Sequence, residues 1–284
     1  MIPRCFLFVP ADSQRKFEHA TGSAAEALIL DLEDSIPAPG KAMARKQVRE
    51  MLASIPARQQ AWVRVNALDT GLLLDDLCAV IGSKLFGIIL PKCDGRETLQ
   101  QVSHYLDALE RQAGVPPGQT RIMIIATETA RSMFGLGGYA SVSPRLWGIT
   151  WGGEDLAADI GSLENRRLDQ YTEPYRLARA MCLYAAAAAG VYAVDAVCVQ
   201  FTREDILEKE ATEAFQDGFS GKLSIHPRQI ASINQAFTAS VEQLAWARRI
   251  IDAFEQAPGT GAFSLDGEMI DRPHLRLARR ICGS

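Results

Sequence analysis

Two carboxylates, Glu128 and Asp155, each close a short apolar run, residues 123–128 and 148–155. Continuous apolar runs of this length are typical of buried parallel strands, whose C-terminal ends gather on one face when the strands form a barrel. The two carboxylates would then be neighbours. Such a pair, completed by waters and a chelating substrate, suits Mg²⁺, which rarely has an all-protein cage. Alternatively, one or both acids cap the helix that follows, because acidic side chains are common at helix N-termini.

Arg64 lies in an otherwise apolar run, residues 62–66 (Trp-Val-Arg-Val-Asn). A charged side chain is almost never buried without a partner, so Arg64 must pair with a carboxylate or face an open barrel mouth. At the mouth, its planar fork of donors would bind a substrate carboxylate. Glu33 and Asp34, at the end of the preceding run, are its expected partners. A purely structural ion pair is the other interpretation.

Basic residues follow the acidic pair and also end the fourth run. Lys41 and Arg45 begin a helical pattern with a basic face, and a phosphate-bearing ligand would find favourable charge there. The same spacing is also typical of a solvated helix face. Lys92 is interpreted as a surface-directed or ion-paired lysine rather than a Schiff-base nucleophile, because the sequence shows no apolar pocket around it.

Eight apolar runs alternate with helical patterns along the first 240 residues. The runs occupy residues 6–10, 28–34, 62–66, 88–92, 123–128, 148–155, 194–200 and 222–227. The helical patterns occupy residues 13–24, 41–54, 73–82, 96–113, 130–140, 174–189, 203–217 and 228–237. This alternation indicates a parallel α/β sheet, and eight repeats favour a closed (β/α)8 TIM barrel, which needs about 250 residues. An open doubly wound sheet is the alternative, but no Gly-x-Gly-x-x-Gly motif follows the first run.

Residues 241–284 depart from the repeat. They contain an amphipathic helix pattern, a hairpin pattern around Asp266 and Gly267, and a last helix opened by Pro273. We expect a catalytic barrel over residues 1–240 and a helix-and-flap extension over residues 241–284. The pattern alone leaves open whether such an extension closes the barrel bottom or reaches over a neighbouring subunit.

The composition of the chain limits the classes of binding partner that we expect. The 284 residues carry a net charge of −4 with 23% charged side chains, so we expect no general attraction for nucleic acid or anionic membranes. No apolar stretch reaches the roughly 18 residues that a membrane span needs. Six cysteines without a Cys-x-x-Cys spacing argue against a zinc site and a disulfide framework. We therefore expect no membrane association and a cytoplasmic location.

Motifs in a fixed order extend this interpretation over almost the whole chain. They are Arg-Cys-Phe-Leu-Phe-Val-Pro (4–10), Leu-Ile-Leu-Asp-Leu-Glu-Asp-Ser-Ile (28–36), Val-Arg-Val-Asn (63–66), Leu-Pro-Lys (90–92), Ala-Thr-Glu-Thr-Ala (126–130), Gly-Gly-Glu-Asp-Leu-Ala-Ala-Asp-Ile-Gly (152–161), Gly-Phe-Ser-Gly-Lys-Leu-Ser-Ile-His-Pro (218–227) and Asp-Gly-Glu-Met-Ile-Asp (266–271). Together they closely resemble the citrate lyase beta-subunit-like family, which includes malyl-CoA and citramalyl-CoA lyases.

The resemblance implies a Mg²⁺-dependent (β/α)8 lyase that cleaves a 3-hydroxyacyl thioester to a 2-oxo acid and acetyl-CoA or another acyl-CoA. By position, it makes Glu128 and Asp155 the metal ligands. It makes Arg64 the group that meets the oxo-acid oxygen or carboxylate. It assigns Glu33 and Asp34 to the acidic pair of the second strand.

The resemblance also implies where CoA and a second subunit would meet the site. It places Lys41 and Arg45 toward the phosphates of CoA. It implies that Asp271 acts as acid or base in the site of the next subunit, so residues 241–284 would pack on a neighbour. The expected assembly is a homo-oligomer, either a trimer or a dimer of trimers.

The leading hypothesis is a free-standing lyase for citramalyl-CoA or malyl-CoA that acts by retro-Claisen cleavage. The first alternative is the citryl-ACP lyase beta subunit of a citrate lyase complex, in which a carrier protein presents the thioester. A non-catalytic barrel that only binds Mg²⁺ and an oxo acid is an alternative of another class. A pyruvate-dependent class II aldolase without a thioester substrate is disfavoured, because such aldolases do not share the Lys41 region or the Met-Ile-Asp tail.

Overall fold

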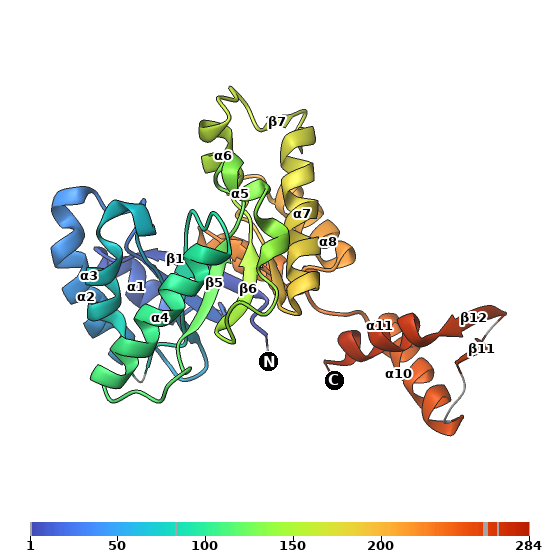
Figure 1. The fold of residues 1–284 in the computed structure, drawn as a ribbon. Coiled ribbons are helices and arrows are strands. Elements are labelled where there is room, and N and C mark those ends of the chain that lie inside the picture. The colour runs from blue at the N-terminus through green and yellow to red at the C-terminus, as the bar shows by residue number, and fades with distance from the viewer. Residues whose placement is uncertain (1, 83, 258–260, 266, 284) are drawn as a thin grey trace. The chain divides into compact units, whose positions relative to one another are not determined.

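Eight parallel strands close into a barrel in the computed structural model (Figure 1). The strands are β1 (Cys5–Pro10), β2 (Ala27–Asp31), β3 (Gln60–Arg64), β4 (Gly87–Leu90), β5 (Arg121–Ile125), β6 (Leu146–Thr150), β9 (Tyr192–Asp195) and β10 (Gly221–Ser224), and β10 pairs with β1 to close the ring. The predicted (β/α)8 TIM barrel is therefore confirmed. The structure describes residues 2–82, 84–257, 261–265 and 267–283. The chain divides into two compact units, Ile2–Gln235 and Ala236–Ser284.

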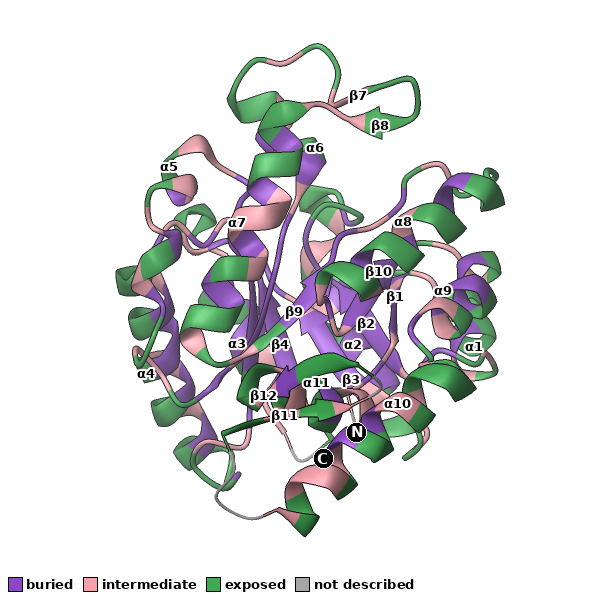
Figure 2. Ribbon diagram, turned by 90° about the vertical axis from the view of Figure 1, so that its right-hand side faces the viewer, coloured by how far each residue is buried: buried purple, intermediate pink, exposed green. Residues whose placement is uncertain are grey.

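Helices connect the barrel strands and carry their exposed faces outward (Figure 2). They are α1 (Gln14–Thr21), α2 (Lys41–Ser54), α3 (Leu73–Val80), α4 (Arg96–Gln112), α5 (Ala130–Met133), α6 (Gly153–Asp159), α7 (Glu173–Ala189), α8 (Glu204–Asp217) and α9 (Ile230–Ala236), with short 3₁₀ turns at Ala38–Gly40, Leu68–Thr70, Leu136–Gly138 and Pro227–Gln229. Local signals set their ends: the Ser13 hydroxyl caps α1, and Gly190 ends α7 in the left-handed region at a φ of 69°. No helix in the described part of the chain is both long and apolar enough to cross a membrane.

Large side chains fill the inside of the barrel. The buried cluster there includes Phe6, Trp62, Met123, Val194 and Leu223. Gly87 makes room for Trp62, because a Cβ at residue 87 would lie only 2.6 Å from the indole ring. With a packed interior, functional groups can gather only where the strands open into loops.

The strand ends lie earlier than the sequence predicts. β5 stops at Ile125 and β6 at Thr150, so the prediction that strands run on to Glu128 and Asp155 is wrong. α6 begins at Gly153, and its first turn carries Asp155. An acidic residue in the first turn is favourable at a helix N-terminus, and Asp155 therefore belongs to the helix rather than to the strand.

A hairpin between α6 and α7 was not predicted. It pairs β7 (Arg166–Arg167) with β8 (Gln170–Tyr171). Its turn residues Leu168 and Asp169 have φ angles of 47° and 62°. Such left-handed turns normally contain Asn-Gly or Asp-Gly, and this sequence lacks that signal.

The C-terminal unit packs two helices and a hairpin around its own small core. Its elements are α10 (Val241–Gln256), β11 (Ala262–Leu265), β12 (Glu268–Asp271) and α11 (Arg272–Cys282), and its buried cluster comprises Ala247, Ile250, Ile270 and Ala278. The predicted hairpin is present, since β11 and β12 pair antiparallel from Ala262 opposite Asp271 to Leu265 opposite Glu268. Gly267 supplies a φ of 84° in the turn, whereas Asp266 lies outside the described residues.

Candidate active site

The C-terminal ends of the barrel strands surround a cavity of about 990 Å³. Its wall includes four predicted site residues, Asp34, Arg64, Glu128 and Asp155. Three of them follow strand ends in loops or in the first turn of a helix, and Arg64 is the last residue of β3. The structure therefore brings these predicted groups to one cavity.

Asp31 holds Arg64 from the neighbouring strand. The two residues are register partners on β2 and β3, and the Arg64 Nε and Nη2 atoms each donate a hydrogen bond of 2.8 Å to the carboxylate. The Nη1 atom lies 3.0 Å from Glu33 Oε2 and 3.4 Å from Asp34 Oδ2. The guanidinium also stacks over Phe8, 4.9 Å from the ring centre. The expected partners of Arg64 are in place, but the unpredicted Asp31 makes the bidentate contact.

The Asp31 carboxylate stays ionised although it is buried. Burial alone would raise its pKa, but Arg64, Ser35 and the backbone N–H of Glu33 hold the pKa of Asp31 below its ordinary value. The sequence contained part of the signal for this pair, because Asp31 and Arg64 each follow apolar residues of a predicted strand. The structure adds that the two residues lie in the same register. Asp31 uses two of the five guanidinium donors and fixes the plane of the others.

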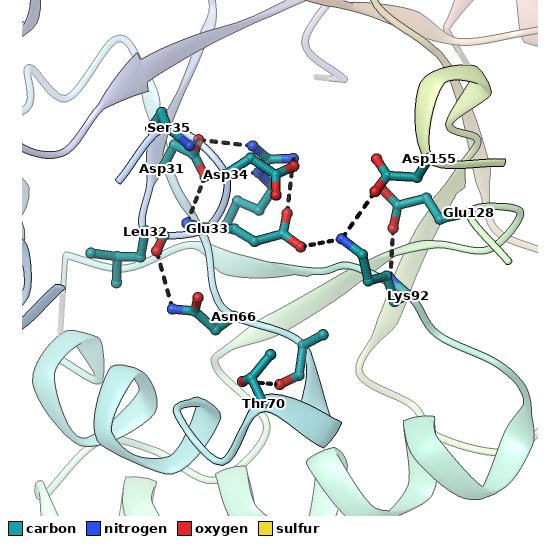
Figure 3. Close-up of polar contacts among 12 residues, drawn as sticks. Asp31, Leu32, Glu33, Asp34, Ser35, Asn66, Thr70, Lys92, Glu128 and Asp155 are labelled. Atoms are coloured by element: carbon teal, nitrogen blue, oxygen red, sulfur yellow. Dashed lines mark hydrogen bonds and ion pairs between the residues drawn. The ribbon is translucent and has the colours of Figure 1, made fainter. Parts of the chain in front are cut away.

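Lys92 links the acidic loops to one another, as Figure 3 shows. Its Nζ lies 2.6 Å from Glu33 Oε1 and 3.2 Å from Asp155 Oδ1, and its backbone N–H donates to Glu128 Oε2 at 2.6 Å. The backbone has a left-handed φ of 49°, a costly conformation for a residue with a side chain. Desolvation would lower the pKa of Lys92, yet the contact with Glu33 and the charge of Glu128 raise it above its ordinary value. The interpretation of Lys92 as an ion-paired lysine is therefore confirmed.

Glu128 is a buried carboxylate in the cavity wall. It is only 3% exposed. Burial, together with repulsion from Glu33 and Asp155, raises the pKa of Glu128 to about 8. Gly152 leaves space for its side chain, because a Cβ at that position would lie 2.8 Å from Glu128 Cγ. Burial is the largest cause of this shift, and Lys92 only partly opposes it.

A divalent cation fits this donor set. Five carboxylates (Asp31, Glu33, Asp34, Glu128 and Asp155) interact with three cations, Arg64, Lys92 and Lys41, which leaves an excess of two negative charges when all are ionised. Figure 3 shows Glu128 and Asp155 side by side. Over the described residues, no group of three or more His, Cys, Asp or Glu side chains is arranged to hold a metal by itself. A pair of carboxylates that leaves positions for water and substrate is a typical Mg²⁺ arrangement.

Lys41 and Arg45 lie outside the cavity wall. The Lys41 Nζ donates to the carbonyls of Leu32 and Glu33, both at 2.7 Å, and to Asn66 Oδ1 at 2.6 Å. These contacts hold the loop that carries Glu33. Desolvation lowers the pKa of Lys41, although neighbouring acids oppose the shift. Arg45 Nε donates to the buried Asp76 at 2.7 Å. The structure thus gives Lys41 partners in the loop that carries Glu33, and it gives Arg45 a partner on α3.

Other cations line the mouth of the cavity. Arg15 and Lys16 on α1 and Arg228 after β10 are exposed and belong to its wall. They were not singled out in the sequence, although Arg15 and Lys16 open the helix that directly follows the first strand. An anionic ligand that extends out of the cavity would meet positive charge here.

Asp271 belongs to the C-terminal unit. It precedes α11, where its Oδ1 atom lies 2.7 Å from His274 Nδ1 and its side chain caps the helix. The Asp271 side chain is 33% exposed. Its assignment to the active site of another subunit stays a prediction.

Known proteins resemble this chain over nearly its full length. Residues 4–227 match the family model described as HpcH/HpaI aldolase/citrate lyase. The chain is 34% identical to a citrate lyase subunit beta-like protein of Mycobacterium tuberculosis, over 97% of this chain and 93% of that protein. It is 31% identical to a mitochondrial citramalyl-CoA lyase of Rattus norvegicus, over 98% of this chain and 84% of that protein.

A solved structure has the same fold. The crystal structure of the protein CitE from Mycobacterium tuberculosis, in complex with magnesium, acetoacetate and coenzyme A, matches with a TM-score of 0.78 and 32% identity. The match covers 99% of this chain and 97% of that one. The resemblance seen in the sequence motifs is thereby confirmed, and the chain belongs to the HpcH/HpaI aldolase/citrate lyase family.

Proposed function

We propose that the chain is a Mg²⁺-dependent carbon–carbon lyase that cleaves a citramalyl-CoA or malyl-CoA type thioester to a 2-oxo acid and acetyl-CoA. The observation that carries the proposal is the presence, in one cavity, of the Glu128 and Asp155 carboxylates and the Arg64 guanidinium fixed by Asp31. The rat citramalyl-CoA lyase and the mycobacterial structure with magnesium, acetoacetate and coenzyme A support this choice of substrate class.

Glu128 and Asp155 would hold Mg²⁺ together with waters. The ion supplies Lewis acidity toward an oxo-acid oxygen when it is bound. Arg64 would donate a hydrogen bond to the same oxo acid from the second N–H of Nη2, because Asp31 accepts from Nε and Nη2, and Glu33 and Asp34 already contact Nη1. Glu33 helps to orient the two cationic side chains of the site, because one of its oxygens contacts Arg64 and the other contacts Lys92.

The reaction needs one proton removed and one proton returned. A base takes the proton of the 3-hydroxyl, the bond between C2 and C3 breaks, and its electron pair passes to the thioester as an enolate. The enolate then takes a proton on carbon to give acetyl-CoA. In this proposal Asp271 of a second copy of the chain is the acid and base, so the active enzyme is a homo-oligomer.

The CoA part of the substrate would extend through the mouth of the cavity. Arg15, Lys16 and Arg228 supply positive charge there for its phosphates. Lys41 and Arg45 were predicted for this task, but their cationic groups already contact loop carbonyls, Asn66 and Asp76. The mouth cations are therefore the better candidates for direct phosphate contact.

A substrate panel tests the proposal. Citramalyl-CoA, malyl-CoA, citryl-CoA and a citryl thioester on its carrier protein are incubated with and without Mg²⁺, and oxo acid, acetyl thioester and free thiol are measured separately. The proposal requires Mg²⁺-dependent release of oxo acid and acetyl-CoA from a CoA thioester. Cleavage of only the carrier-protein thioester would indicate a citrate lyase subunit, and binding without turnover would indicate a non-catalytic barrel.

Two carboxamide variants test the metal ligands. Glu128→Gln and Asp155→Asn keep the size of the side chains and should each abolish Mg²⁺-dependent turnover and weaken Mg²⁺ binding in calorimetry. Retained turnover in either variant would reject that residue as a ligand.

Mixed oligomers test the second copy. Asp271→Ala and Glu128→Gln subunits, each inactive alone, should regain part of the activity when they are mixed. A site is then intact where Glu128 comes from an Asp271→Ala subunit and Asp271 comes from a neighbouring Glu128→Gln subunit. No recovery in oligomers shown by mass to contain both variants would reject the role of Asp271 in a neighbouring site.

A further inference from the structure

A second buried charge cluster joins β9 and β10, where Asp195 is the last residue of β9 and Lys222 lies within β10. Asp195 and Lys222 are register partners on these strands, and both are almost completely buried. The Lys222 Nζ donates to Asp195 Oδ2 at 2.7 Å, and the Arg179 Nε donates to Oδ1 at 3.0 Å. Burial alone would raise the pKa of Asp195, but Lys222 and Arg179 hold it below its ordinary value. Asp195 is therefore an ionised acceptor inside the fold.

One further donor connects this cluster to the cavity. The indole Nε1–H of Trp151 donates to Asp195 Oδ1 at 2.8 Å. Trp151 is only 1% exposed, yet it belongs to the cavity wall. A hydrogen bond to an ionised acceptor is stronger than a neutral one, so it fixes the rotation of the indole ring.

The Trp151 ring supports the beginning of α6. Its Cζ3 atom lies so close to Gly153 that a Cβ there would be 3.3 Å away. Its other neighbour is Tyr171, whose ring packs edge-on with centres 5.0 Å apart. Figure 1 shows α6 and β7 near the upper end of α7, which runs along the side of the barrel. Gly153 begins α6, and Asp155 follows two residues later in its first turn.

We infer that Asp195 is a positioning residue, which orients Trp151 by its hydrogen bond and thereby sets the first turn of α6 and the Asp155 carboxylate beside Glu128. This inference rests on the proposed metal-binding role of that carboxylate pair. Groups that orient metal ligands typically change metal affinity about 10–100-fold when they are removed. The hydrogen bond, and not the buried ion pair, is the feature that carries the effect.

Three variants separate the hydrogen bond from the ion pair. Trp151→Phe removes the Nε1 donor and leaves Asp195 with both of its cations. Asp195→Ala/Lys222→Met removes the acceptor without leaving a buried lysine unpaired. Asp195→Asn/Lys222→Met also removes the ion pair but retains an amide oxygen that accepts from the Trp151 Nε1–H. The affinity for Mg²⁺ alone is measured by titration calorimetry, and the melting temperature of each variant is recorded.

We expect Trp151→Phe and Asp195→Ala/Lys222→Met each to weaken Mg²⁺ binding about 10-fold. The triple variant Trp151→Phe/Asp195→Ala/Lys222→Met should bind Mg²⁺ no more weakly than Trp151→Phe or Asp195→Ala/Lys222→Met, because both changes break the same contact. Asp195→Asn/Lys222→Met should restore affinity close to that of the wild type, even if its melting temperature remains lower. If Asp195→Ala/Lys222→Met does not fold, Trp151→Phe and the amide variant still decide the matter.

Several results would overturn the inference. Unchanged Mg²⁺ affinity in Trp151→Phe would show that the indole contact is not used, and additive losses in the triple variant would separate Asp195 from Trp151. Equal losses in the amide and alanine variants would assign the effect to the ion pair. Failure of the wild-type protein to bind Mg²⁺ would instead reject the proposed metal site itself, so the two failures are distinguishable.

Discussion

Gly152 leaves space beside Glu128 that any side chain would fill. An ideal Cβ at residue 152 would lie 2.8 Å from Glu128 Cγ and 3.3 Å from its Oε1 atom. The backbone of Gly152 has a φ of −132°, which alanine adopts without strain. The change Gly152→Ala therefore tests one contact and not the conformation of the loop.

The displacement follows from these distances. Ordinary contact begins near 3.4 Å, so the Glu128 side chain must move by about 0.6 Å, and local overpacking of this kind costs about 1–3 kcal/mol. Glu128 has little freedom to move, because it is buried and its Oε2 atom accepts from the Lys92 N–H at 2.6 Å. We expect Mg²⁺ affinity to fall about 10-fold or more and kcat/KM to fall about 100-fold.

Calorimetry with Mg²⁺, thermal unfolding and turnover of the best thioester in the panel form the assay. Gly137→Ala is the matched control, because an added Cβ there meets nothing within 4 Å and should leave all three measurements unchanged. Wild-type Mg²⁺ affinity in a folded Gly152→Ala variant would refute the reasoning that Glu128 is held by this packing.

Two further substitutions test other parts of the structure. Arg64→Lys should lower kcat/KM about 100-fold, because lysine cannot make the bidentate contact with Asp31, while Mg²⁺ affinity stays near that of the wild type; steady-state kinetics showing more than a tenth of the activity would contradict this. Burial alone would raise the pKa of Glu110, but two hydrogen bonds from Arg145, with others from Thr120 and Gly118, hold it at about 2 instead of its ordinary 4.5. The folded pKa is depressed, so about 3 kcal/mol of stability is present above pH 4.5 and is lost as the pH falls toward 2. Urea unfolding should show this loss in the wild type and not in Glu110→Gln, and parallel pH profiles would reject the assignment.

The barrel could be predicted because each of its strands is buried on both faces. Runs such as residues 28–31 and 121–125 therefore contain almost no polar residues except at their ends, and periodicity detects that pattern well. Glu128, Asp155 and Arg64 could be predicted to meet because parallel strands bring their C-terminal ends to one side. The convergence of these groups depends on topology alone.

The contacts that hold these site residues in place depend on loop conformation, which the hydrophobic pattern does not encode. The left-handed backbone at Lys92 turns its N–H toward Glu128. The sequence does not predict this conformation, because residue 92 is not a glycine or an asparagine. The same limit applies to Lys41, whose three acceptors come from residues 32, 33 and 66. The sequence alone does not distinguish a basic residue at the start of a helix that binds a ligand from one that binds its own loop.

Two buried acids, Asp31 and Asp195, have the same structural role: each accepts at least one hydrogen bond from a residue of the cavity wall. A buried ion pair is weak evidence for stability, because the cost of desolvation often exceeds the attraction of the charges. Each acid instead fixes the orientation of a group in the cavity wall, the guanidinium of Arg64 in one case and the indole of Trp151 in the other. The pKa of each is held below its ordinary value by its cations, so both acceptors remain charged through neutral pH. The pH dependence of turnover near neutrality should therefore reflect the groups that contact metal and substrate, while the supports that orient them do not change their charge.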